Sequence, residues 1–302
     1  MNDEVDTGAF RIEPGSKVDL ARLPTRIDPF YRSKKEYEKL LAESNERIGT
    51  LQNVMYAHDR HALLLIFQGM DSAGKGGAIK HVMSGVNPQG CQVFSFGPPC
   101  AEDLEHDFLW RAVRRLPERG RIGIFDRSYY EEVVVVRVMP ELLARQRLPA
   151  EFVAPGRIWR ERYRDIVRLE DFLHRNGTRI VKFFLHLSKE EQRRRLLERI
   201  EAPHKNWKAK RGDLEARARW DDYRTAYEQC LAATSSAKAP WYAVPADDKR
   251  NARLIVGRVV AETLASLDMD FPRSDAAHRA ELAEMRALLE QEAGRKKSHK
   301  ND

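Results

Sequence analysis

The chain has 302 residues, a formal net charge of +7, 42% hydrophobic residues and 33% charged residues. This length and composition are those of a folded protein with an extensive core, and they exclude wholesale disorder. The positive charge indicates an anionic partner but does not distinguish nucleic acid, nucleotide or another polyanion. Cys91, Cys100 and Cys230 are widely spaced and indicate neither a disulfide framework nor a zinc site. The apolar runs are too short to span a bilayer, so we expect a cytoplasmic protein with no membrane partner.

The first 30 residues contain several prolines and little periodicity, which favours an extended arm rather than a packed element. From Ser33 to about Met55, apolar residues recur at helical spacing among lysines and glutamates. This pattern predicts an amphipathic helix that leads into the core. We therefore assign residues 1–56 to an N-terminal arm and helix.

Short apolar runs then alternate with helical stretches, which predicts a parallel sheet with helices on both faces. Two runs, ALLLIF and IVKFFLHL, are apolar nearly throughout, as is typical of central strands. We expect a three-layer α/β fold with a sheet of about five strands in a core that spans residues 57–270. The predicted strands are residues 62–68, 92–96, 121–126, 179–187 and 241–245.

The remaining segments are predicted from local signals. Ser188 and Glu191 have the spacing of a capping box and should begin a helix with both halves of the box formed. Prolines and a glycine in residues 141–157 indicate a connecting or covering segment. Residues 271–302 are assigned to a C-terminal helix, from about Asp275 to Ala293, and a disordered basic tail. One side of that helix carries Leu282, Met285 and Leu289.

The segment GMDSAGK has the spacing of a Walker A loop and lies between an apolar strand and a predicted helix. In such a loop the amides and the start of the helix point at one spot, where an oligophosphate can bind with Lys75 on its outer oxygens. Two residues depart from the usual pattern. Gly76 replaces the Ser or Thr that binds magnesium, and Asp71 places a carboxylate where anions should bind. The predicted nucleotide- and polyphosphate-binding residues of the loop are Gly69, Ser72, Ala73, Gly74, Gly76 and Gly77.

A second acidic residue, Asp126, ends a predicted strand, which is where a Walker B carboxylate holds the metal. A divalent cation would remove the repulsion between Asp71 and phosphate, because Mg²⁺ bridges carboxylates and substrate phosphates. We therefore expect Asp71 and Asp126 to bind Mg²⁺, with Mn²⁺ as the alternative. Such a site suits a substrate that is rich in phosphate.

The helix after Ser188 places Gln192, Arg195 and Arg199 on one face, and spacing alone leaves two interpretations open. Glutamates four residues from arginines predict an ion-paired helix surface. The basic stretch that follows is instead typical of a lid over phosphates, which we place at residues 188–225. The expected ion pairs are Glu190–Arg194, Glu191–Arg195 and Arg194–Glu198. Three aromatic residues are expected to pack the lid on the core rather than stack on a base: Trp207, Trp220 and Tyr223.

Together these motifs resemble the polyphosphate kinase 2 family, P-loop enzymes that move phosphate between inorganic polyphosphate and nucleotides. The resemblance covers about residues 31–267. It rests on six ordered blocks: GMDSAGKGG, VNPQG, FDRSYYEEV, SKEEQRRRLLER, NWK and APWYAVPADDK. It implies a thymidylate-kinase-like P-loop kinase fold with a helical lid, and a homo-oligomer, either a tetramer or a dimer.

The resemblance also implies roles for individual residues. Asp71 and Asp126 would be the metal-associated acids, and Lys75 and Arg127 would bind phosphate. The lid arginines would be Arg195 and Arg199. Two lysines match regions that bind the nucleotide or polyphosphate, namely Lys80 and Lys208, although Lys80 could equally face only solvent.

We therefore expect a Mg²⁺-dependent, reversible transfer between polyphosphate and purine nucleotides, with AMP or ADP as acceptor and ADP or ATP as product. Guanine nucleotides are further candidate substrates. The segment YYEEV resembles members that accept AMP, or both AMP and ADP, more than members that act on diphosphates alone. One alternative is an ATP-dependent nucleoside monophosphate kinase, against which Gly76 and Asp71 argue. The other is a basic nucleic-acid-binding protein with a vestigial P-loop, but the sequence contains no recognisable base-reading module.

Overall fold

The computed structural model describes residues 5–154 and 156–298, and the chain divides into two compact units. The first unit ends at Met269 and the second begins at Asp270. The first unit holds the sheet, the predicted Walker A loop and the predicted lid, and the second holds the C-terminal helix.

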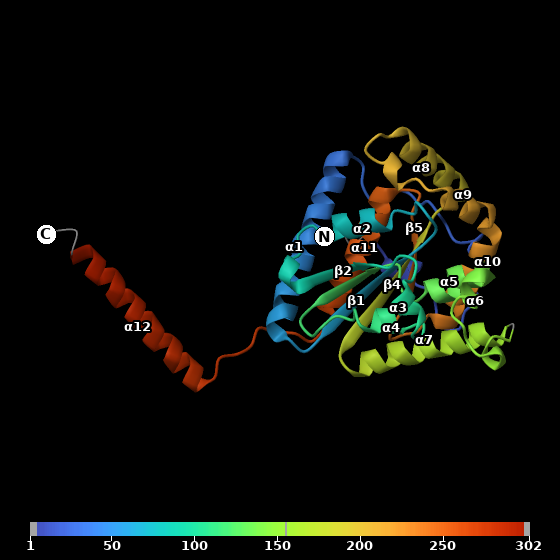
Figure 1. Ribbon diagram of the computed structural model, residues 1–302. Helices are drawn as coiled ribbons and strands as arrows, with labels where there is room; N and C mark the ends of the chain where they lie inside the picture. Colours follow the sequence, from blue (N-terminus) through green and yellow to red (C-terminus); the bar gives the residue numbers. More distant parts are fainter. Residues whose placement is uncertain (1–4, 155, 299–302) are drawn as a thin grey trace. The chain divides into compact units, whose positions relative to one another are not determined.

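Across the described residues, the first unit contains one sheet of five parallel strands in the order β2-β3-β1-β4-β5 (Figure 1). The expected strands and the three-layer α/β fold are confirmed. In register, Phe67 of β1 lies between Asp126 of β3 and Phe183 of β4. Because the strands are parallel, the loops that follow them gather at one edge of the sheet. The strands are β1 (Ala62–Gln68), β2 (Cys91–Ser95), β3 (Ile122–Asp126), β4 (Thr178–His186) and β5 (Trp241–Pro245).

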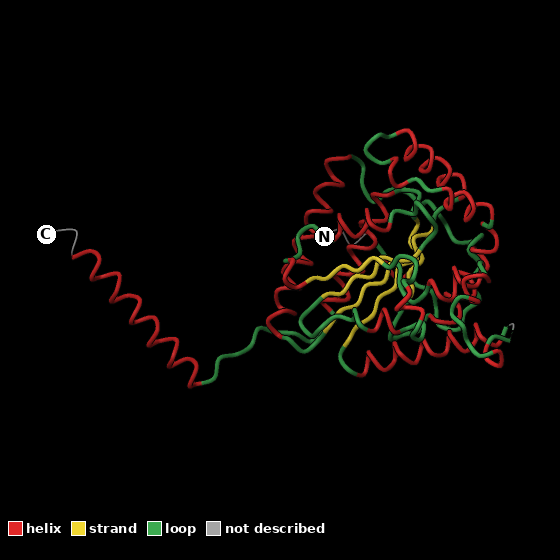
Figure 2. Tube along the Cα trace, viewed as in Figure 1, coloured by secondary structure: helices red, strands yellow, loops and turns green. Residues whose placement is uncertain are grey.

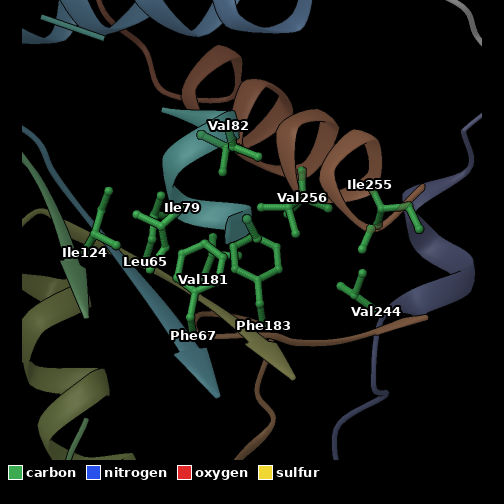
Figure 3. Close-up of a cluster of buried hydrophobic side chains, with 14 of the residues drawn as sticks. Leu65, Phe67, Ile79, Val82, Ile124, Val181, Phe183, Val244, Ile255 and Val256 are labelled. Carbon is green, nitrogen blue, oxygen red and sulfur yellow. The ribbon is translucent and has the colours of Figure 1, made fainter. Parts of the chain in front are cut away.

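Helices cover both faces of the sheet (Figure 2). One face carries α1 (Lys34–His58), α2 (Lys75–Val82) and α11 (Lys249–Ala265). The other carries α5 (Glu131–Val138), α7 (Arg157–Arg175) and α10 (Trp220–Thr234). Figure 3 shows how apolar side chains of α2 and α11 pack on the strands beneath them. Every residue of β1 is buried, which explains why this strand is apolar nearly throughout.

The remaining elements are short helices, the helix α8 and the C-terminal helix α12. The α-helices are α3 (Ala101–Leu104), α4 (Trp110–Val113), α6 (Pro140–Ala144), α8 (Lys189–Glu201), α9 (Arg211–Ala218) and α12 (Ala276–Ser298). The 3-10 helices are η1 (Thr7–Phe10), η2 (Pro88–Gly90), η3 (Ala150–Phe152) and η4 (Asn206–Lys208). In the ranges that the structure describes, no helix is both long enough and apolar enough to cross a membrane.

The N-terminal segment differs from the expected extended arm, because its apolar residues are packed on the core. The N–H of Ile12 donates to the carbonyl of Trp241 at 2.8 Å, and Arg11 forms a bridge with Tyr242, so the segment lies along β5. Prolines prevent a long helix here, but they do not prevent the residues between them from packing. The buried apolar residues of this segment are Phe10, Ile12, Val18 and Leu20.

In the second unit, α12 continues to Ser298, beyond the predicted end near Ala293. The basic residues that were expected to begin a disordered tail are therefore helical as far as Ser298. Residues 299–302 lie outside the described residues. The three apolar residues predicted on one side of this helix are all exposed: Leu282, Met285 and Leu289.

Candidate active site

The Walker A residues form a tight loop between β1 and α2. Gly69 has a φ of +148°, and a Cβ there would lie 2.8 Å from the carbonyl oxygen of Leu185, so this position requires glycine. Gly74 is the residue before α2 and has a φ of +105°. Ser72 adopts a left-handed conformation without being glycine. The loop therefore leads directly into the start of α2, and a helix start of this kind favours anion binding.

Lys75 is the first residue of α2 and is buried within the loop. Its ammonium donates to the carbonyls of Gly69 at 2.8 Å and Met70 at 3.4 Å. Burial lowers the pKa of Lys75, and the charge of Arg127 lowers it further, while nearby carboxylates oppose both effects. A phosphate oxygen would add further negative charge beside this buried cation.

Arg127 and Asp71 face each other across the loop, with Nη2 of Arg127 at 3.4 Å from Oδ1 of Asp71. Both side chains are partly exposed. Arg127 follows the last residue of β3 and has a φ of +66°, and its N–H donates to the carbonyl of Phe67 at 3.0 Å. Burial opposes the charge of Arg127, but the carboxylates of Glu131, Asp71 and Asp126 raise its pKa. A strained backbone therefore holds a permanent cation beside the P-loop.

The geometry around Gly76 explains how the loop can lack a hydroxyl. A Cβ at this position would lie 3.7 Å from Oδ2 of Asp126, so the Walker B carboxylate occupies the neighbourhood where a Ser or Thr side chain would point. Among the described residues, no three His, Cys, Asp or Glu side chains come together as a metal cluster. Asp71 and Asp126 nevertheless fit Mg²⁺, which proteins bind through one or two carboxylates together with substrate phosphates.

Glu131 is a charged residue of this site that the sequence analysis did not single out. It lies in the first turn of α5, and burial raises the pKa of its carboxyl, while Arg127 and Lys75 lower it. Its position five residues after Asp126 was the available signal, because the first turn of the helix after β3 lies at the same edge of the sheet.

The face of α8 that carries Gln192, Arg195 and Arg199 contacts the P-loop. Nε2 of Gln192 donates to the carbonyl of Asp71 at 3.0 Å. Arg195 is buried and donates to the carbonyls of Ser72 at 3.1 Å and Ala73 at 2.9 Å, and also to those of Ala246 and Asp247. Arg199 is less buried and donates to Oγ of Ser72 at 2.7 Å and to Asp213 at 3.0 Å. The predicted face therefore points at the P-loop, and the roles of these arginines toward phosphate stay predictions.

The start of α8 differs from one of our expectations. Oγ of Ser188 accepts from the N–H of Glu191 at 3.1 Å, but Glu191 does not return the bond, because its carboxylate is bound by Arg194 and Arg195. The N–H of Ser188 donates to Asp247 instead. Hydrogen bonds from Arg194, and then from Arg195, lower the pKa of Glu191 to about 2, although burial opposes this shift.

The ion pairs of α8 follow the prediction only in part. Arg194 pairs with Glu198 at 3.7 Å as expected, and Arg195 pairs with Glu191 at 2.8 Å. Glu190, however, pairs with Arg193 at 2.6 Å rather than with Arg194. A partner three residues away is as accessible on a helix as one four residues away, so spacing alone could not choose between them.

The two remaining predicted lysines are exposed, and their contacts with substrate stay predictions. Lys80 lies on the outer side of α2. Lys208 lies in η4, with Nζ at 4.9 Å from the ring centroid of Trp207. Trp207 itself is 73% exposed, so the expectation that it packs the lid on the core is wrong, whereas Tyr223 is buried as expected. Nε1 of Trp207 donates to the carbonyl of His204 at 3.2 Å, and Lys208 lies over its ring, so this tryptophan contacts its own segment.

Comparison with known proteins assigns this chain to a family. Residues 31–272 match the family described as Polyphosphate kinase 2. The ADP-polyphosphate phosphotransferase of Rhodopseudomonas palustris is 59% identical over 286 residues, which cover 95% of this chain and 99% of the relative. The AMP/ADP-polyphosphate phosphotransferase of Meiothermus ruber is 40% identical over 269 residues, with coverages of 89% and 96%.

A solved structure agrees with these sequence relationships. The crystal structure of polyphosphate kinase 2 from Arthrobacter aurescens superposes with a TM-score of 0.81 at 39% identity, and the match covers 91% of this chain and 95% of that one. The expected P-loop kinase fold is confirmed, and the readings as an ATP-dependent monophosphate kinase or a nucleic-acid-binding protein are not supported. The chain therefore belongs to the polyphosphate kinase 2 family and is a polyphosphate-dependent kinase.

Proposed function

We propose that the chain transfers phosphoryl groups reversibly between inorganic polyphosphate and adenine nucleotides, with Mg²⁺ as the metal and with both ADP and AMP as acceptors. The observation that carries this proposal is the pairing of two unusual features in one loop. Asp71 lies inside the P-loop beside Arg127, and the carboxylate of Asp126 lies next to Gly76. Two carboxylates beside an anion-binding loop repel phosphate unless a cation binds between them and the phosphate.

The chain's own groups can perform this transfer without a nucleophilic side chain. An oxygen of the acceptor's terminal phosphate attacks the terminal phosphorus of polyphosphate, and the bond from that phosphorus to its bridging oxygen breaks. The shortened polyphosphate leaves with the negative charge. Lys75, Arg127 and the loop amides would hold the phosphates in line, and Arg199 could stabilise charge on the transferring group. A divalent cation held by Asp71 and Asp126 would neutralise further phosphate charge.

The choice of acceptor rests on two independent supports. The YYEEV segment after Ser128 resembles members that take AMP, or both AMP and ADP. The relative from Rhodopseudomonas palustris is named for ADP, and the relative from Meiothermus ruber is named for both nucleotides. Acceptance of both nucleotides is the one assignment compatible with the segment and with both names.

Purified protein incubated with polyphosphate, MgCl₂ and one nucleotide at a time tests the proposal, with products separated by anion-exchange chromatography. AMP and ADP should each be phosphorylated, and GMP and GDP serve as the test of base range. Parallel reactions with EDTA or MnCl₂ test the metal. If ATP phosphorylates AMP while polyphosphate does not, the proposed donor is wrong. If only one adenine nucleotide reacts, the proposed acceptor range is wrong.

A homo-oligomer, either a tetramer or a dimer, is the second part of the proposal, and it rests on the family relationship alone. Size-exclusion chromatography with light scattering measures the mass of the assembly directly. A mass equal to the 34.9 kDa of one chain would contradict it.

A further inference from the structure

A lysine interrupts the apolar run IVKFFL of strand β4. Lys182 is fully buried, and the phosphate chemistry described above does not use it. Its Nζ has three donors and uses all of them. It donates to Oε2 of Glu170 in α7 at 2.6 Å, to Oη of Tyr130 at 3.0 Å and to the carbonyl of Thr234 in α10 at 2.7 Å. The lysine therefore joins two helices and the segment before α5 within the core.

The partner carboxylate, Glu170, is 2% exposed and binds two consecutive tyrosines. Its Oε1 accepts from the hydroxyl of Tyr129 at 2.9 Å and from that of Tyr130 at 2.7 Å. Both tyrosines are buried. Burial raises the pKa of each tyrosine well above its ordinary value, and the charge of Glu170 raises it further, so both hydroxyls keep their protons and donate.

The two tyrosines belong to the short segment that carries Arg127. This segment runs from Arg127, just after β3, to Tyr130, just before α5. Arg127 has a φ of +66°, which is unfavourable for a residue with a Cβ. Oγ of Ser128 accepts from the N–H of Tyr130 at 3.1 Å and from Nε2 of Gln68, the residue before the P-loop, at 3.3 Å. The segment is therefore bound to β1 beside the P-loop and to Glu170 in the core.

The burial of Lys182 and Glu170 is not explained by stability alone. Desolvation of two charges offsets their attraction, and apolar residues of similar size often stabilise a core equally well. The tyrosine rings would be buried by apolar packing in any case. An acceptor at residue 170 adds a fixed position for their two hydroxyls, and hence for the backbone that follows Arg127.

We propose that Glu170, with Lys182 as its counter-ion, is a positioning residue for phosphoryl transfer, which fixes Tyr129 and Tyr130 and thereby holds Arg127 at the P-loop. This inference rests on the proposed function, in which Arg127 binds phosphate, and adds what keeps that arginine in an unfavourable backbone conformation. Glu170 and Lys182 act through the segment that carries Arg127 rather than on the substrate. Such positioning affects the rate because phosphoryl transfer depends mainly on the placement of charged groups.

Two double variants that differ only at residue 170 test the proposal. Glu170→Gln with Lys182→Met removes both charges but keeps an acceptor oxygen for the tyrosines. Glu170→Met with Lys182→Met removes the acceptor as well, at nearly the same side-chain length. The variant without the acceptor should have a kcat about tenfold below that of the variant with it, whereas their KM values for ADP should agree within about twofold. Urea unfolding measures the stability of both proteins separately. Equal kcat values would overturn the inference.

A pair of single variants keeps the test available if a double variant does not fold. Tyr129→Phe is paired with Tyr163→Phe, because Tyr163 is a buried tyrosine of α7 whose hydroxyl accepts from Nη1 of Arg137 at 3.1 Å. Each variant keeps its ring and loses a hydroxyl, so the two should lose similar stability. Tyr129→Phe should lower kcat about fivefold, and Tyr163→Phe should leave it unchanged. Equal kcat values in these two variants would show that the Tyr129 hydroxyl supports only the core, and the inference would be wrong.

Arg127→Ala identifies the residue through which Glu170 acts. When this substitution is added to both double variants, their kcat values should agree within about twofold, because the positioned group is absent. A difference that persists without Arg127 would mean that Glu170 acts through another residue, and would also overturn the inference. Failure of the proposed function would appear differently, as wild-type protein that phosphorylates neither adenine nucleotide from polyphosphate.

Discussion

The two halves of α8 contact the same P-loop but are held in different ways. In the first half, Arg195 has a side chain that is 4% exposed, and it donates to backbone carbonyls of the P-loop and of the segment after β5. In the second half, Arg199 is 23% exposed, and its partners are the side chains of Ser72 and Asp213. One arginine is therefore bound by fixed backbone, and the other by side chains that can rotate.

This difference indicates different roles for Arg195 and Arg199, for which the sequence predicts the same role. If Arg195 left its partners, buried carbonyls would lose their donors, which is costly. If residues 188–225 act as the predicted lid, we expect Arg199 to exchange Asp213, a residue of α9, for a phosphate oxygen. We therefore expect the first half of α8 to stabilise the conformation of the P-loop and the second half to bind the substrate phosphate.

Arg195→Ala should have the largest effect, because it should lower both the stability of the fold and the rate of phosphoryl transfer. We expect kcat to fall by on the order of a hundredfold or more and the free energy of unfolding to fall by about 3 kcal/mol. Urea unfolding followed by circular dichroism measures the second quantity. If kcat falls while stability is unchanged, Arg195 acts on phosphate directly and the proposed division of α8 is wrong.

Arg199→Ala should lower kcat by a similar factor, on the order of a hundredfold or more, with almost no change in folding. Its ion pair with Asp213 is partly exposed, and such pairs contribute less than about 1 kcal/mol. The same urea experiment serves here, with Arg193→Ala as the control, since Arg193 pairs with Glu190 on the outer side of the helix. An intact kcat would mean that the mobile cation of the lid lies elsewhere, first of all at Lys208.

Asp71→Asn should lower kcat by more than about tenfold and change nucleotide binding little, because a metal contact matters most as charge develops in the transition state. The backbone of this residue is held separately, by Gln192, so the loop should keep its shape. Turnover at saturating MgCl₂ and a nucleotide titration give the two quantities. Near-normal turnover would show that Asp71 serves only to pair with Arg127.

Gly76→Ser should change kcat of the wild type by no more than about twofold, since a Cβ at this position meets Oδ2 of Asp126 at an ordinary contact distance of 3.7 Å. The added hydroxyl is the group that the loop lacks. We therefore expect the same substitution to restore part of the activity of Asp71→Asn. A double variant no better than Asp71→Asn alone would place the metal away from Gly76.

Much of the P-loop site was predictable because its residues are contiguous in the sequence or end a strand. Gly69, Asp71 and Lys75 belong to one run, and Asp126 ends β3, so the parallel sheet brings them to one edge. The pairing of Glu132 with Arg162 was not predictable, since the two residues lie 30 positions apart in the sequence. They meet only when α5 and α7 pack on the same face of the sheet.

The packing of the N-terminal segment also could not be predicted from local sequence signals. Its prolines correctly predict the lack of a long helix, but local signals carry no information about a partner 229 residues away, such as the bond from Ile12 to Trp241. The start of α8 is a third example. Spacing predicted the cap at Ser188, yet the choice of Glu191 between the backbone and two arginines depends on how deeply Arg195 is buried.

Arg194→Ala should have the smallest effect and gives the baseline for α8. Arg194 is 58% exposed and faces away from the P-loop, so we expect kcat to be unchanged and stability at pH 7 to fall by only a few tenths of a kcal/mol. The loss should depend on pH, because the bond from Arg194 is the largest reason that the pKa of Glu191 is about 2. A depressed carboxyl pKa stabilises the fold above the ordinary value of 4.5, and this stabilisation disappears as pH falls toward 2. Thermal unfolding of wild type and variant should therefore differ at pH 7 and converge near pH 2. A variant as impaired as Arg199→Ala would mean that the outer side of α8 also acts on phosphate.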